Sequence, residues 1–290
     1  MTADASKVIS IRDVKSIAEM REVEELQKEV WGMDDRDVVP VMNLIAVVQS
    51  GGALIGAFDG DVMVGFAYGF GGCEHGGMSL HSHMLAVKPA YRNYNLGYRL
   101  KLAQREHALS KGLTLMTWTF DPLQSLNAHF NFSKLGVVSD SYRINFYGDA
   151  TSSFLHRTGT DRLWVSWLLD SHRVKERLAG TAAPELPERL LELMPPLVRM
   201  NDDGSPQRGD LVAGLAGNFA LIEVPRDIVG LQRRDPELGV AWREATREAF
   251  TTAMNSGFLV EDFYRRNASG ESGGAYVLRA TGKLEDFTRY

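Results

Sequence analysis

The chain has 290 residues, of which 44% are hydrophobic and 24% are charged, and its formal net charge is −5. This composition is typical of a folded globular protein and excludes a fibrous repeat or a wholly disordered chain. The negative charge argues against a protein that binds duplex nucleic acid, because such proteins gain much of their affinity by neutralising phosphates. We therefore expect small molecules as partners.

The single cysteine, Cys73, excludes an internal disulfide and a cysteine-based zinc cluster, and it fits a reducing compartment. The first ten residues lack the basic and then apolar pattern of a secretory leader. No apolar run approaches the ~20 residues that a membrane span needs. The sequence therefore predicts a cytoplasmic location and no membrane partner.

Strands and helices alternate along the first half of the chain, as hydrophobic periodicity indicates. In chain order we predict a strand at 7–14, helices at 15–32 and 40–50, a strand hairpin at 53–59 and 62–70, a glycine-rich loop at 71–77, a strand at 78–87, a helix at 96–112, a strand at 113–120, a helix at 121–136 and a strand at 137–148.

The second half has a looser pattern with a proline-containing linker within 180–210. The predicted elements are strands at 162–169 and 219–225, a helix at 235–256, and strands at 257–266 and 275–280. The class is therefore α/β (α+β), with a mixed central sheet, flanking helices and a C-terminal α+β extension. We predict domains at 1–150 and 211–290, joined by a strand, helix and linker region at 151–210.

A polar segment from Arg92 to Gly97 separates the strand 78–87 from the helix that follows it. Unpaired N–H groups and the helix dipole make a helix N-terminus an anion site, and a phosphate is its natural occupant. Asn95 can take the place of a glycine, because asparagine tolerates positive φ. The alternative is an ordinary turn with Asn95 as N-cap, and this segment alone favours neither interpretation.

The same segment resembles the signature of the GNAT family of acyl-CoA N-acyltransferases: arginine or glutamine, two residues, glycine, one residue, then glycine or alanine. The signature falls on Arg92, Asn95 and Gly97, with Asn95 in the place of the first glycine. The segment 121–136 resembles a later helix of the family. Within it Phe132 stands where the family often has the tyrosine that protonates the leaving thiolate.

This resemblance implies an acyl-CoA co-substrate, acetyl-CoA or another such as succinyl-CoA. It implies that main-chain groups at Leu85 and Val87 pair with the pantetheine arm, and that the segment after them holds the pyrophosphate. The implied co-substrate residues are Leu85, Val87, Arg92, Asn93, Tyr94, Asn95, Leu96, Gly97 and Tyr98.

Two histidines, His81 and His83, share one face of the strand 78–87. An amine arrives protonated at neutral pH, so a base with a pKa of about 7 assists its attack, and histidine fits that task. His83 matches the position of a catalytic glutamate in many relatives, so we predict His83 as the base, with His81 as a second candidate. The alternatives are two hydrogen-bonded structural histidines, or a metal pair without a visible third ligand; we expect no metal.

Phe132 cannot donate a proton, but a thiol with a pKa of about 8.5 can leave as a thiolate without an acid. Tyr142 and Tyr147 are alternative donors, although ordinary strand packing also explains them. Asp121 precedes a proline and reads as the N-cap of the helix 121–136.

Substrate contacts are predicted on two helices. Asn131 belongs to a polar group beside the expected acyl site. Arg243 and Arg247 lie at i and i+4, and arginine suits planar carboxylates. The alternative is a solvated face on which these arginines pair with nearby acidic residues, namely Glu244, Glu248 or Asp262.

Five segments resemble a bacterial GNAT subgroup with a C-terminal extension, whose members are predicted acetyltransferases, some looking like N-succinyltransferases of amino acids. The segments are 80–92, 101–109, 120–136, 242–250 and 257–263. We predict an N-acyltransferase that moves an acetyl or succinyl group directly to a small amine such as an amino acid. The alternative is a non-catalytic acyl-CoA sensor on a degenerate GNAT fold; a homodimer is an open expectation.

Overall fold

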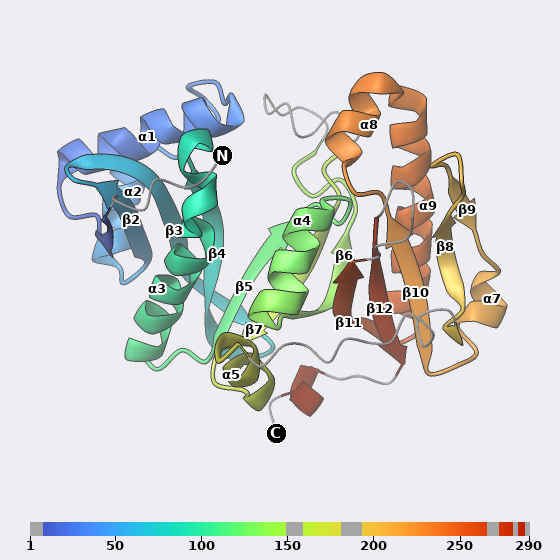
Figure 1. Cartoon of the computed structure of the whole chain (residues 1–290). Coiled ribbons are helices and arrows are strands. Elements are labelled where there is room, and N and C mark those ends of the chain that lie inside the picture. Colours follow the sequence, from blue (N-terminus) through green and yellow to red (C-terminus); the bar gives the residue numbers. More distant parts are fainter. Residues whose placement is uncertain (1–7, 149–158, 181–192, 266–272, 281–283, 288–290) are drawn as a thin grey trace. The chain divides into compact units, whose positions relative to one another are not determined.

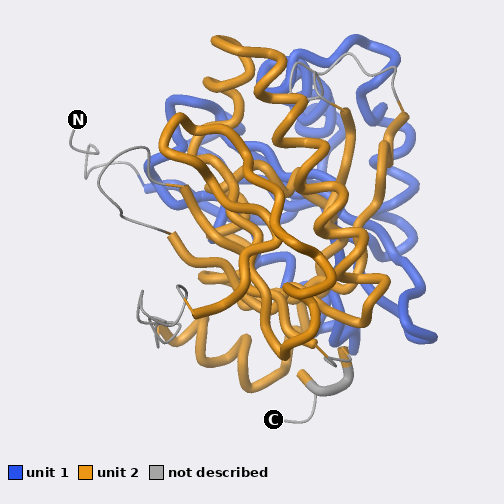
Figure 2. Tube along the Cα trace, turned by 90° about the vertical axis from the view of Figure 1, so that its right-hand side faces the viewer, with its two compact units in different colours: residues 1–118, 150–156 blue, residues 119–149, 157–290 orange. Residues whose placement is uncertain are grey.

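The computed structural model describes residues 8–148, 159–180, 193–265, 273–280 and 284–287 (Figure 1). The chain forms two compact units (Figure 2). The first unit comprises residues 1–118 and 150–156, and the second comprises 119–149 and 157–290. These limits differ from those of the three predicted domains, whose independence as folding units stays a prediction.

The sheet of the first unit has the strand order β1-β2-β3-β4-β5. Its strands are β1 (Ile9–Asp13), β2 (Ala53–Asp59), β3 (Val62–Glu74), β4 (Gly77–Val87) and β5 (Leu115–Phe120). Neighbours run antiparallel except β4 and β5, which run parallel. A parallel pair needs a crossover, and here η1 (Pro89–Tyr94) and α3 (Leu96–Ser110) supply it.

Helices cover both faces of this sheet. On one face, α1 (Ile17–Trp31) and α2 (Val41–Gln49) bury Val23 and Leu44 against Phe58 and Phe66 of the strands. The helix α1 begins at a capping box of Ser16 and Glu19 and ends at Gly32, whose φ is 67°. On the other face, α3 contacts Ser82 of β4 through hydrogen bonds.

The sheet of the second unit has the order β7-β6-β11-β12-β10-β8-β9, in which β8 and β10 run parallel. Its strands are β6 (Val138–Arg143), β7 (Arg162–Leu168), β8 (Pro196–Met200), β9 (Pro206–Arg208), β10 (Phe219–Val224), β11 (Phe258–Arg265) and β12 (Gly274–Ala280). Its helices are α4 (Ser125–Ala128), η2 (His129–Leu135), α5 (His172–Leu178), α7 (Leu211–Gly214), α8 (Ile228–Arg234), α9 (Pro236–Asn255) and η4 (Leu284–Phe287).

The longest helix of this unit, α9, carries much of its core. Asp235 caps it by accepting a hydrogen bond from the Leu238 amide, and Pro236 occupies its first position. Trp242 and Phe250 are fully buried on its inner face. The indole of Trp242 donates to the Gly204 carbonyl at 3.0 Å, so the polar atom of this buried ring is satisfied.

The predicted α+β class, with mixed strands, flanking helices and a C-terminal α+β part, is confirmed. The predicted loop at 71–77 is wrong, because β3 and β4 continue through it and turn at His75 and Gly76, with φ of 49° and 76°. Positive φ at both positions is what a tight hairpin turn requires. The predicted linker is also wrong in part: β8 and β9 lie inside it, while 181–192 fall outside the described residues.

The predicted helix 121–136 begins later, at Ser125, and continues as the π-helical turn η2. Asp121 does not cap it; its Oδ1 accepts a hydrogen bond from the Leu123 amide at 3.0 Å and so forms a local turn. The predicted strand 137–148 ends at Arg143. No described helix has the length and apolar character of a membrane span.

Candidate functional site

The strand β4 has an edge that β5 follows only at its beginning. The two strands pair at Leu80–Met116 and His81–Thr117. β4 then continues to Val87, and β3 remains paired with it there, at Gly65–Val87. The stretch 82–87 therefore presents a strand edge beyond its described pairs with β5, to which an extended ligand can add through main-chain hydrogen bonds.

A β-bulge lies in this edge at His83. Tyr68 pairs with Met84 and Gly69 with Ser82, so His83 is the extra residue of β4. Gly69 is required opposite it, because an added Cβ would lie 2.9 Å from the His81 carbonyl oxygen. The bulge brings the half-buried His83 ring to 5.6 Å from the Phe70 ring. Within the described chain, no hydrogen bond engages the ring nitrogens of His83.

The structure brings the two predicted histidines together, with ring centres 6.3 Å apart. His81 is 9% exposed, and its Nδ1 lies 3.0 Å from the Thr117 hydroxyl. Burial, together with the nearby His83 and Lys101, lowers the pKa of His81 to about 4. Burial also lowers the pKa of His83. Both imidazoles are thus neutral at neutral pH, and His83 is the one whose ring is open to a substrate.

A third basic group, Lys101 on α3, lies near the two histidines and was not predicted from the sequence. It is 4% exposed, its Nζ donates to Ser82 Oγ at 2.8 Å, and it lies 3.6 Å from the centre of the Trp118 ring. Ser82 in turn donates to Gln104 at 2.8 Å. Burial lowers the pKa of Lys101 well below its ordinary value, which favours the neutral amine. Its only sequence signal is helical spacing with the buried Gln104 and Ala108.

The start of α3 carries backbone donors without a side-chain cap. Asn95 closes η1 and precedes α3 with φ 55° and ψ 27°, the left-handed conformation that a glycine would adopt. Asn95 occupies the N-cap position, as the alternative interpretation expected, but its side chain makes no capping hydrogen bond. The first helical bond runs from the Arg99 amide to the Asn95 carbonyl at 3.2 Å. The amides of 96–98 precede that bond and are available to an anion.

Space around Gly97 fits a ligand close to the backbone. The nearest atom to an added Cβ would be Leu85 Cδ2 at 3.7 Å, an ordinary contact, so the fold itself does not require glycine there. Arg92 and Asn93 are exposed at the end of η1, while the Leu96 side chain is buried. These features together suit a phosphate group that approaches the α3 N-terminus.

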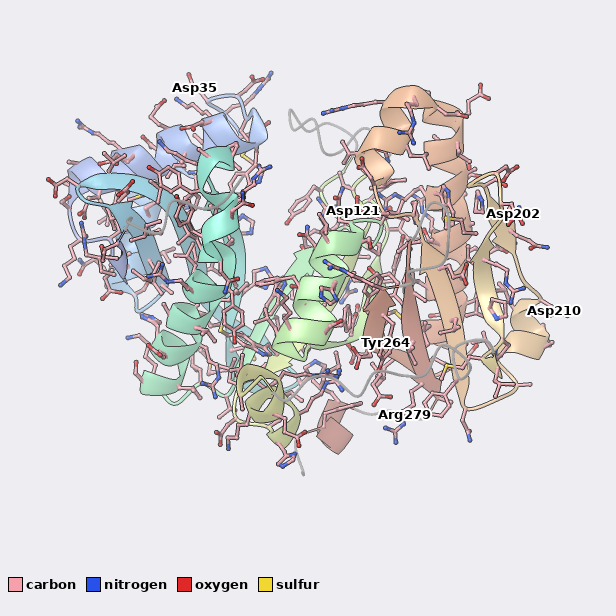
Figure 3. The ribbon with its side chains drawn as sticks, viewed as in Figure 1. Asp35, Asp121, Asp202, Asp210, Tyr264 and Arg279 are labelled. Atoms are coloured by element: carbon pink, nitrogen blue, oxygen red, sulfur yellow. The ribbon has the colours of Figure 1, made fainter. Side chains whose placement is uncertain are left out.

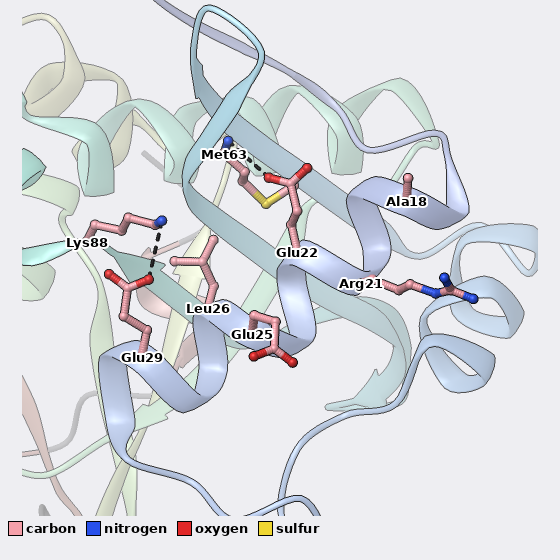
Figure 4. Close-up of a pocket in the computed structure, with 8 residues that line it drawn as sticks. All are labelled: Ala18, Arg21, Glu22, Glu25, Leu26, Glu29, Met63 and Lys88. Atoms are coloured by element: carbon pink, nitrogen blue, oxygen red, sulfur yellow. Dashed lines mark hydrogen bonds and ion pairs between the residues drawn. The ribbon is translucent and has the colours of Figure 1, made fainter.

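A separate hollow of about 220 Å³ lies between α1 and β3 (Figure 4). Three of its charged side chains have partners: Glu22 accepts from the Met63 amide at 3.2 Å, and Lys88 pairs with Glu29 at 3.3 Å. These three groups are therefore already engaged within the first unit.

The predicted substrate residues of the second unit are buried. Arg243 is 2% exposed and donates at 2.7 Å to Asp121, which is labelled in Figure 3. Its Nε and Nη1 have no hydrogen-bond partner among the described residues. Arg247 pairs with Asp161 at 2.8 Å. Asn131 lies buried on η2. Arg243 therefore does not lie on the solvated face of the alternative interpretation, whereas the Arg247 side chain is 32% exposed. A substrate role for Arg243 and Asn131 stays a prediction.

The acidic partners proposed for these arginines pair elsewhere. Glu244 and Glu248 contact Arg208, and Asp262 pairs with Arg177 at 2.6 Å. Pairing of Arg243 or Arg247 with them is therefore wrong.

Aromatic residues near the predicted acid position have packing roles. Phe132 is fully buried, with edge contacts to Phe120 and Tyr276. Tyr142 donates to Asp161 at 2.7 Å, and burial raises its pKa well above the ordinary value. Its hydroxyl is thus held by a carboxylate. Among the described residues, no group of three His, Cys, Asp or Glu side chains could hold a metal ion.

The chain matches no family model and no curated protein. Solved structures similar to it include the ribosomal-protein-S18-alanine N-acetyltransferase of Escherichia coli, at 12% identity and a TM-score of 0.45, over 56% of this chain and 94% of that one. Another is Arabidopsis thaliana Naa50 in complex with a CoA bisubstrate analogue, at 16% identity and a TM-score of 0.43, over 55% and 97%.

A third is the aminoglycoside 6′-N-acetyltransferase of Enterococcus faecium, at 18% identity and a TM-score of 0.41, over 56% of this chain and 97% of that one. At these identities and TM-scores the similarity does not define a reaction, which has to be inferred from this chain's own residues.

Proposed function

We propose that this chain is an acyl-CoA-dependent N-acyltransferase of the GNAT type. One observation carries the proposal: a single crossover joins the strand edge at 82–87, which lies beyond the described pairs with β5, to a helix N-terminus that begins with a left-handed Asn95 and lacks a side-chain cap. An extended pantetheine arm suits the edge, and a pyrophosphate suits the N-terminus.

Different groups of the first unit would bind the two parts of the acyl-CoA. Main-chain groups of Leu85 and Val87 would hold the pantetheine arm. The amides from Asn93 to Tyr98, with the Arg92 guanidinium beside them, would hold the pyrophosphate. The phosphate can approach the backbone at Gly97, where the nearest atom to an added Cβ would be Leu85 Cδ2 at 3.7 Å.

The bulge residue His83 is the proposed base. Acyl-CoA supplies the activated acyl group. The neutral imidazole of His83 takes a proton from the acceptor ammonium, directly or through a water, so that the nitrogen can form the new C–N bond as the C–S bond breaks. A thiol with a pKa of about 8.5 can leave as a thiolate, so the absence of a tyrosine at Phe132 does not prevent the transfer. His81 lies on the same strand, with its Nδ1 3.0 Å from the Thr117 hydroxyl, and is the second proposed catalytic histidine.

The donor and acceptor are proposed on the resemblance of the five segments. These favour an acetyl or succinyl donor and a small amine, such as an amino acid, as acceptor. Asn131 and Arg243 remain the proposed substrate contacts. A homodimer and a cytoplasmic location stay predictions from the sequence.

Release of CoA thiol tests the proposal. The full chain is mixed with acetyl-CoA or succinyl-CoA and a panel of amino acids, and thiol is followed with a chromogenic disulfide. Amine-dependent release is the expected result. A thermal shift with CoA but no release with any amine would leave the sensor alternative, and no shift with any CoA would overturn both.

A further inference from the structure

The second unit contains a larger hollow whose residues differ from those of the proposed acyl-CoA site. Its volume is about 660 Å³, within the range of small-molecule pockets. One wall comes from the sheet. Asp262 of β11 lies opposite Val277 of β12, and the wall also includes Tyr264 of β11 and Arg279 of β12, both labelled in Figure 3. Helix α5 and the segments 193–195 and 217–219 also line it. We call it the α5–β12 hollow.

A buried guanidinium in this hollow has an unused donor. The side chain of Arg177 on α5 is 6% exposed, and its Nη2 donates to Asp262 at 2.6 Å. Among the described residues, its Nη1 has no hydrogen-bond partner. A buried charged donor is costly to leave unsatisfied, so an acceptor is expected opposite Nη1.

The charges around the hollow do not cancel. Arg173, Arg177 and Arg279 line it together with Glu261 and Asp262, which leaves one positive charge in excess. Arg173 is held rigidly, because it donates to the Gly136 carbonyl at 3.1 Å and to the Glu261 carbonyl at 2.6 Å. The excess therefore suits a monoanion, and the planar guanidinium suits a carboxylate in particular.

The rest of the lining is apolar. Leu193, Met194 and Val277 contribute hydrocarbon surface, and the ring of Tyr264 packs with Met194 against the same small core. We propose that the α5–β12 hollow binds a small monocarboxylate with an apolar body, its carboxylate on Arg177 Nη1 and its body against these side chains.

Calorimetric titrations of the full chain test the proposed carboxylate site. They compare octanoate with octanamide, which has the same hydrocarbon chain but no charge. We expect octanoate to bind with a Kd below about 1 mM and octanamide at least about tenfold more weakly. Arg177→Lys keeps a cation for Asp262 but removes the second nitrogen, so it should weaken octanoate about tenfold. Arg208→Gln is the matched control, because Arg208 pairs with Glu248 outside the hollow, and should change nothing.

A second readout protects the test against a misfolded Arg177 variant. The unmodified chain is labelled with ¹³C at its methionine methyl groups, and the NMR signal of Met194 is assigned as the one that Met194→Leu removes. Octanoate should shift this signal.

Arg279→Gln changes a side chain that is 47% exposed, and it should weaken the binding of octanoate severalfold. Equal binding of octanamide, a stationary Met194 signal, or binding of inorganic phosphate as tight as that of octanoate would each overturn the proposal.

Discussion

Lys101 and Ser82 are joined by a hydrogen bond of 2.8 Å inside the first unit, and the lysine faces an indole ring. Burial lowers the pKa of Lys101 well below its ordinary value, whereas the unfolded chain holds this proton up to a pH of about 10.5. The unfolded state therefore binds more protons, and the free energy of unfolding should rise with pH by up to about 1.4 kcal/mol per pH unit on this account.

Lys101→Met should reduce the increase of the unfolding free energy with pH, and it should raise the stability at pH 7. Urea unfolding at pH 7 and 9.5 measures both effects, and Lys111→Met, at an exposed lysine, should behave like the unmodified chain. Equal destabilisation by Lys101→Met at both pH values would show that the lysine is charged in the fold.

His81 should make the first unit sensitive to acid. Its pKa is about 4 in the folded state and about 6.5 in the unfolded state. Between these two pH values the imidazole is therefore protonated in the unfolded state and neutral in the folded state. The free energy of unfolding should fall by about 3 kcal/mol between pH 6.5 and 4 from this residue. His81→Gln should remove most of that loss in unfolding experiments, whereas His172→Gln, at an exposed histidine, should not.

Gly97→Pro tests the proposed pyrophosphate site through a backbone donor. The first turn of a helix tolerates proline, and the nearest atom to an added Cβ would be Leu85 Cδ2 at 3.7 Å, so the free energy of unfolding should change by less than about 1 kcal/mol. CoA affinity should fall at least about tenfold, because proline removes one of the N–H groups proposed to hold the pyrophosphate. Gly97→Ala is the matched control: it keeps the N–H group, and the resembled signature also has alanine at this position, so it should keep its CoA affinity. Unchanged CoA affinity in Gly97→Pro would contradict the assigned pyrophosphate site.

His83→Ala tests the proposed base. The rate of acyl transfer should fall about 10²–10⁴-fold while CoA binding stays unchanged, because the ring lies at the edge of β4 and makes no hydrogen bond within the described chain. The loss should shrink at high pH, where the amine is already neutral. A pH-independent loss would instead point to a positioning role.

Asp121→Ala should destabilise the second unit by about 3–5 kcal/mol, because it leaves Arg243 buried without its anion. Glu248→Ala breaks an exposed pair with Arg208 and should cost at most about 1 kcal/mol. Thermal unfolding compares them, and similar losses in the two variants would refute a buried charge at Arg243.

Local patterns predicted most of the elements, and long-range pairing explains what they missed. Asn95 could be read as a glycine substitute because its tolerance of positive φ is intrinsic. The segment 71–77 looked like a loop because glycine disfavours strands, yet pairing with β4 holds it extended. The pair of Arg243 and Asp121 joins residues 122 positions apart, and no local pattern encodes such a distance.

The position of β12 constrains how the second unit assembles. This strand lies between β10 and β11 and pairs antiparallel with both, although it follows them in the chain. Until residues 274–280 have left the ribosome, β10 and β11 each present an open edge to other chains. The sheet of the second unit therefore closes late in synthesis, and a truncation before Gly274 would remove its centre and favour aggregation.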